Sequence, residues 1–99
     1  MKLKEGSVVY ARIDHKAGGK EETEQDGQDC MAYWQNLAKE RHAVAGIFGN
    51  MELGEMHGAM VLFEAKDMEE AQKIAQNDPI IARGFYRYEL YRWNVAMVS

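Results

Sequence analysis

Alternation of apolar and polar positions opens the chain and predicts a β-strand over residues 7–14. Val9, Ala11 and Ile13 share one face of that segment, which is rich in β-branched residues. The following segment, residues 15–29, holds three glycines, five carboxylates and no large apolar side chain. Because such a composition buries little surface, it predicts a mobile surface loop.

A helical period follows the polar segment, and Asp29 is its expected N-cap. Residues 43–49 and 57–65 are short apolar runs separated by a glycine-containing turn, so they predict two strands. Apolar or long side chains recur at helical spacing along one face of the expected helix: Cys30, Trp34, Leu37, Ala38 and Arg41.

A second helix is predicted after Asp67, which forms an Asp variant of the capping box with Glu70. Pro79, the only proline in the chain, should end this helix, since the residue before a proline is driven out of the α region. Residues 85–93 then predict a last strand, crowded with aromatic side chains.

The predicted order βαββαβ is that of a ferredoxin-like α+β fold with a four-stranded antiparallel sheet, whose strand order is 4-1-3-2. Helices cover only one face of such a sheet. The third strand is nevertheless apolar on both faces, with Val61 and Phe63 on one side and Met60 and Leu62 on the other. A second copy of the chain is the simplest cover, so we expect a homodimer to which residues 94–99 contribute.

Composition bounds the function. The 99 residues predict a single domain over residues 1–99. A net charge of −4 argues against nucleic acid or an anionic membrane as partner. The start of the chain lacks the apolar core of a signal peptide, and Cys30 is the only cysteine, so we expect a cytoplasmic protein without disulfides.

Polar residues from distant segments converge on one end of this predicted sheet. The first strand runs antiparallel to the third and fourth, so its C-terminal end meets the start of the third strand and the turn before the fourth. The residues brought together are Asp14, His15, Asp29, Cys30, His57 and Asp78.

Four of these residues also have an ordinary structural explanation. Asp78 before Pro79 suits a helix stop, and His15 and His57 suit solvated surface positions. Cys30 suits a small core residue, and the aromatic side chains of the last strand suit packing and dimer contact. A metal site of two histidines and one aspartate lacks a supporting motif, so we predict neither a metal nor a cofactor.

The end of the chain resembles the YCII-like family. The segment FEAKDMEEAQKIAQNDPIIARGFYRYELYRW carries that family's strand, its EEA helix, its Asp-Pro pair, a glycine and a strand ending in a basic or aromatic residue. VVYARID and VAGIFG resemble its first half more loosely. The resemblance implies a dimeric α+β barrel and a small enzyme with a characteristic histidine and aspartate, whose relatives act on chlorinated or hydroxylated aromatic ring products.

By this resemblance Asp78 is the family's aspartate. Counting back from Ala45 and Gly46 places Asp29 or Cys30 where the family has its histidine. Neither is a histidine, so the imidazole would have to come from His15 or His57 at the same edge, or the activity is lost.

Three functions are compatible with the sequence. The first is an isomerase- or lyase-type enzyme on a small cyclic or aromatic substrate, in which Asp78 orients His57, the preferred imidazole, or His15 for proton transfer. Residues 15–29 would then act as a lid. The second is a non-catalytic homodimer that binds a small ligand, and the third a haem protein that uses His15 or His57 as axial ligand.

Overall fold

The computed structural model describes residues 2–99. They form four strands, three α-helices and one short 3₁₀ helix. In chain order they are β1 (Val8–Lys16), α1 (Glu24–Leu37), β2 (Ala43–Phe48), η1 (Met51–Leu53), β3 (Gly58–Phe63), α2 (Met68–Asn77), α3 (Pro79–Ala82) and β4 (Tyr86–Asn94).

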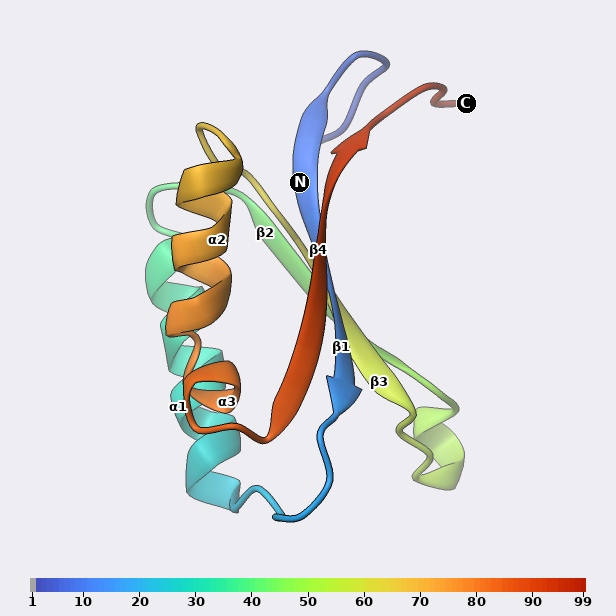
Figure 1. Ribbon diagram of the computed structural model, residues 1–99. Helices are drawn as coiled ribbons and strands as arrows, with labels where there is room; N and C mark the ends of the chain where they lie inside the picture. The colour runs from blue at the N-terminus through green and yellow to red at the C-terminus, as the bar shows by residue number, and fades with distance from the viewer. Residues whose placement is uncertain (1) are drawn as a thin grey trace.

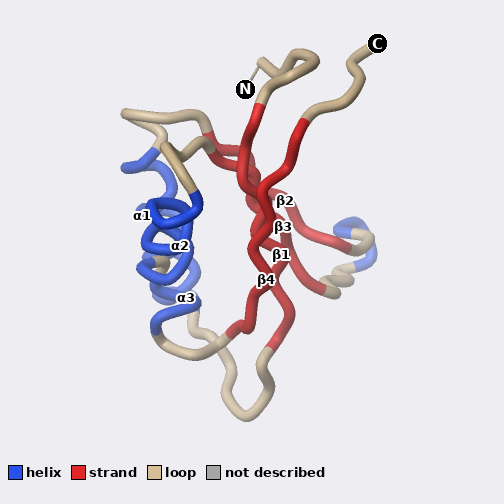
Figure 2. Tube along the Cα trace, turned by 45° about the horizontal axis from the view of Figure 1, so that its top comes forward, coloured by secondary structure: helices blue, strands red, loops and turns tan. Residues whose placement is uncertain are grey.

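The sheet has the predicted ferredoxin-like topology. Its strand order is β2-β3-β1-β4, and every neighbouring pair is antiparallel. All three α-helices lie on one face of the sheet, and both views leave the opposite face uncovered along most of its length (Figures 1 and 2). The expected α+β fold class is therefore confirmed.

The hydrophobic core fills the space between the sheet and the helices. Its centre is Phe63, which is fully buried and lies 5.3 Å from the Trp34 ring and 6.3 Å from the Tyr10 ring, measured between centroids. Helix α2 closes the core with Ala71 and Ile74. These residues come from both halves of the chain, so the core forms only when the two βαβ halves come together.

Helix α1 begins earlier than the hydrophobic period predicts. Thr23 caps it, with its hydroxyl accepting from the backbone N–H of Asp26 while the Asp26 carboxylate accepts from the backbone N–H of Thr23. The predicted loop over residues 15–29 is therefore wrong in its second half, and the helix does not start at Asp29. Reciprocal capping stabilises a first turn that has no apolar face of its own.

Pro79 does more than end a helix. Helix α2 stops at Asn77, Asp78 is extended, and Pro79 is the first residue of the short helix α3. Proline favours this position because its missing N–H would have no partner within the helix and its φ is already helical.

The uncovered face of the sheet carries apolar side chains from several strands. Val44, Phe48, Tyr91 and Trp93 remain between 44 % and 49 % exposed on it. The C-terminal tail starts pinned to the N-terminal segment, since Val95 exchanges backbone hydrogen bonds with Gly6 and Ser7, and then leaves Met97 and Val98 exposed. No helix within residues 2–99 is both long and apolar enough to cross a membrane.

Candidate functional site

Strand β1 directs two charged side chains toward the helices. Successive strand residues point to opposite faces, so Arg12 and Asp14 share the face of the core residue Tyr10. Both are almost fully buried, at 0 % and 1 % exposed. Buried charges are costly unless they are paired, so this position calls for close partners.

Arg12 is paired on two sides. Its Nε and Nη2 donate to the two carboxylate oxygens of Asp14, each at 2.8 Å. Nη2 also donates to Asp78 Oδ2 at 2.8 Å, and Nη1 donates to the Ala75 carbonyl at 3.2 Å. The guanidinium carbon lies 5.4 Å from the centre of the Trp34 ring, which adds a cation–π contact.

Asp78 is fully buried and joins three elements. Its Oδ2 accepts from Arg12 on β1, and from Trp34 Nε1 at 2.8 Å and Cys30 Sγ at 3.5 Å on α1. Its Oδ1 accepts from the Ile80 N–H at 3.1 Å and so caps α3. Asp78 is thus both a helix cap and a member of a buried ionic cluster, which we call the Arg12 cluster: Arg12, Asp14 and Asp78.

Burial changes the acid–base properties around this cluster. It raises the pKa of the Asp14 carboxyl, against the opposing effect of the bonds from Arg12. It also raises the pKa of the Cys30 thiol, with the Asp78 charge as the next cause, to about 12. Asp14 is therefore a stronger base than an exposed aspartate, whereas Cys30 stays a neutral thiol and is no nucleophile at neutral pH.

Two members of this cluster, Arg12 and Asp14, form the polar floor of an otherwise apolar cleft of about 350 Å³, whereas Asp78 is not part of its lining. The cleft lies between α1 and the strands β2 and β3, where the small side chains Ala45 and Ala59 leave room. Ile47 and Met51 at its rim are 44 % and 64 % exposed. Its full lining is Arg12, Asp14, Cys30, Met31, Trp34, Ala45, Gly46, Ile47, Met51, Ala59, Met60, Val61 and Ile80.

The expected pair of Asp78 with an imidazole is absent, and this prediction is corrected. His57 is 69 % exposed and lies 3.6 Å from Glu55. His15 points to the uncovered face of the sheet, because it alternates with Asp14, and its Nε2 lies 3.1 Å from Glu89 Oε1. Asp78 instead has Arg12 as its charged partner.

The predicted topology places Asp14 and Asp78 at the same end of the sheet, as observed, but does not reveal Arg12 as the cation between them. In the structure both carboxylates bond Arg12, which is not among the residues predicted for the site. One signal could have identified it: Tyr10, Arg12 and Asp14 follow one another at every second position, so they share a face, and Tyr10 is a natural core residue.

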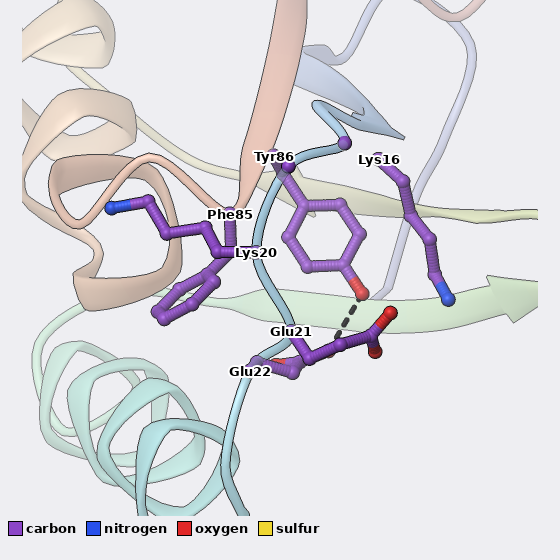
Figure 3. A pocket seen from close by; sticks show the side chains of 8 residues that line it. Lys16, Lys20, Glu21, Glu22, Phe85 and Tyr86 are labelled. Carbon is purple, nitrogen blue, oxygen red and sulfur yellow. Dashed lines mark hydrogen bonds between the residues drawn. The ribbon is translucent and has the colours of Figure 1, made fainter.

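A second, smaller pocket of about 70 Å³ lies under the segment that joins β1 to α1 (Figure 3). The Tyr86 hydroxyl donates to Glu22 Oε1 at 2.7 Å, and Lys20 Nζ lies 5.5 Å from the centre of the Phe85 ring. These contacts fasten the segment to the start of β4. The predicted lid is therefore reduced to the few residues before Thr23, and its movement stays a prediction.

Residues 2–99 contain no group of three or more histidine, cysteine, aspartate or glutamate side chains arranged to hold a metal ion.

Comparison with known proteins assigns the chain to a family. The model of the YCII-related domain matches residues 7–94. The chain belongs to the YCII family. A search of curated proteins gives no match for this YCII protein.

The fold of this YCII protein is similar to that of a solved enzyme structure. The enzyme is the 5-chloro-2-hydroxyhydroquinone dehydrochlorinase of Burkholderia phenoliruptrix AC1100, in complex with 2,5-dihydroxybenzoquinone. The TM-score is 0.60 at 17 % sequence identity, over 87 % of this chain and 93 % of that one. At this identity the likeness establishes the common fold.

Proposed function

We propose that this YCII protein is a small lyase- or isomerase-type enzyme that acts on a hydroxylated or halogenated ring bound in the cleft above the Arg12 cluster. The observation that carries the proposal is the buried Arg12–Asp14–Asp78 cluster, whose Arg12 and Asp14 line an otherwise apolar cleft. Burying three charges is costly, and a carboxylate that lines the cleft and acts on a bound ring would give a reason to keep them.

Asp14 is the proposed general base. It lines the cleft, and its raised pKa lets it accept a proton from a ring hydroxyl or ring carbon more readily than an exposed aspartate would. Arg12 fixes the orientation of the carboxylate through two hydrogen bonds. Asp78 contacts Arg12 rather than the cleft, so we assign it a positioning role.

In this proposal, His57 and His15 can take part in catalysis only after a rearrangement of their side chains. A catalytic role for His57 or His15 requires each side chain to leave its glutamate partner and turn toward the cleft. Turnover measurements on His57→Gln and His15→Gln test that role, and Asp14 is the first choice for the base because it already lines the cleft.

The substrate class is supported by the fold neighbour, which acts on a chlorinated hydroquinone and binds a dihydroxybenzoquinone. The first assay is therefore chloride release from 5-chloro-2-hydroxyhydroquinone by the purified protein. We expect release that depends on protein concentration and saturates with substrate. If neither this compound nor a panel of halogenated phenols and cyclic enones is converted, the enzymatic proposal fails.

A second candidate is a non-catalytic homodimer that binds a small ligand in the same cleft. It is favoured by Asp29 and Cys30, one of which stands where the family resemblance expects a histidine, and by the lack of any imidazole in the Arg12 cluster. Saturable binding of a ring compound without conversion would support this candidate over the enzyme.

A further inference from the structure

The side-chain donors at the floor of the cleft are almost all used within the protein. Arg12 donates through Nε, twice through Nη2 and once through Nη1, to Asp14, Asp78 and the Ala75 carbonyl. A guanidinium has five N–H groups, so one Nη1 proton remains.

The two other polar side chains of the lining on α1 are used in the same way. The Trp34 indole N–H and the Cys30 thiol both donate to Asp78 Oδ2. What remains open to a ligand is acceptor capacity, chiefly the spare lone pairs of Asp14, whose two oxygens each accept one bond from Arg12.

The net charge of the site also disfavours an anionic ligand. One guanidinium and two carboxylates give the Arg12 cluster a net charge of −1, with Arg12 and Asp14 in the cleft lining and Asp78 bonded to Arg12. The rest of the lining carries no lysine, histidine or second arginine. An anion placed in this apolar surrounding would lose its water and meet a negative floor, with no side-chain cation free to pair with it.

From these pairings we infer that the cleft takes uncharged rings that donate hydrogen bonds, such as dihydroxybenzenes, and rejects ring carboxylates and phosphates of similar size. The inference rests on the proposed function only in that the same cleft is the substrate site. Because the inference concerns ligand binding, it can be tested whether or not the protein converts a substrate.

The two tryptophans make a direct test. Trp34 lines the cleft, whereas Trp93 is exposed on the opposite face of the sheet. In ¹H–¹⁵N spectra of the wild-type protein, resorcinol should shift the indole resonance of Trp34 in a saturable way and leave that of Trp93 unmoved. Benzoate at the same millimolar concentrations should shift neither resonance.

Several outcomes would overturn the inference. They are benzoate or phenyl phosphate binding as tightly as resorcinol, benzylamine binding more tightly than resorcinol, or no response of Trp34 to resorcinol. Resorcinol binding to a protein that converts no ring substrate would leave the inference intact and count against the enzymatic proposal alone.

A charge variant and its matched control sharpen the result. Asp14→Asn removes one negative charge from the cleft floor, and Glu89→Gln removes one from β4, where Glu89 bonds His15 on the uncovered face. In Asp14→Asn the preference for resorcinol over benzoate should fall at least tenfold, whereas Glu89→Gln should keep it. An unchanged preference in a folded Asp14→Asn protein would contradict the assignment of selectivity to the cluster charge.

Discussion

The Cys30 thiol reports on the buried cluster without any knowledge of the substrate. Its pKa is raised to about 12 by burial and by the Asp78 charge, so at pH 8 the thiolate should be roughly a thousandfold rarer than in an ordinary cysteine of pKa about 8.5. Alkylation by iodoacetamide at pH 8 should therefore be slow in the folded protein and fast in denaturant.

Asp78→Asn is the matching variant for this measurement. It removes the charge that disfavours the thiolate, so the Cys30 pKa should fall and alkylation of the folded protein should become faster. Wild-type Cys30 that reacts as fast as free cysteine would contradict the proposed contact between the thiol and Asp78.

At the scale of single residues, the positions of the two carboxylates could be predicted from the sequence, but the side chain that pairs with them could not. Topology alone brings Asp14 and Asp78 to the same end of the sheet. The choice between Arg12 and a histidine as the partner of Asp78 depends on which face of β1 meets the helices. The sequence pattern makes Val9, Ala11 and Ile13 the more apolar face of β1, but the helices cover the face of Tyr10, Arg12 and Asp14.

At the scale of secondary-structure elements, two helix-capping aspartates distinguish the stability contributed by helix capping from that contributed by a buried charge. Asp67 caps α2 at the surface, and Asp78 caps α3 while contacting Arg12. Asparagine caps helices about as well as aspartate, so Asp67→Asn should change the free energy of unfolding by less than about 0.5 kcal/mol.

Asp78→Asn should cost more, on the order of 3 kcal/mol, because Arg12 loses one of its two buried countercharges. Chemical denaturation of both variants measures the difference. Equal small losses would mean that Asp78 acts only as the stop between α2 and α3.

Elements with a hydrophobic period were predictable, and the start of α1 was not. Strand β3 and helix α2 follow directly from their apolar patterns. The first turns of α1 consist of polar residues and Gly27, so only the Thr23–Asp26 capping box identifies them. Polar, glycine-containing composition is typical of a loop, so composition alone assigns this segment to a loop when the capping box is overlooked.

At the scale of the whole molecule, the uncovered face of the sheet predicts a homodimer. We propose that a second copy covers it, so sedimentation at micromolar concentration should give about twice the chain mass of 11.3 kDa. Leu62→Lys on this face of β3 should shift the protein to monomer, and Gln76→Lys on the exposed surface of α2 should not. A monomeric wild-type protein would contradict the homodimer.

The central claim is that Asp14 is the base in the cleft, and the pH dependence of kcat/KM for ring turnover tests it most directly. The base works deprotonated and burial raises its pKa, so activity should fall on acidification at a higher pH than an exposed aspartate, with its ordinary pKa of 3.8, would allow. Asp14→Asn should lower kcat/KM by at least about a hundredfold and remove this acid limb, while Glu89→Gln keeps both. A folded Asp14→Asn protein with wild-type kcat/KM and an unchanged acid limb would contradict the account.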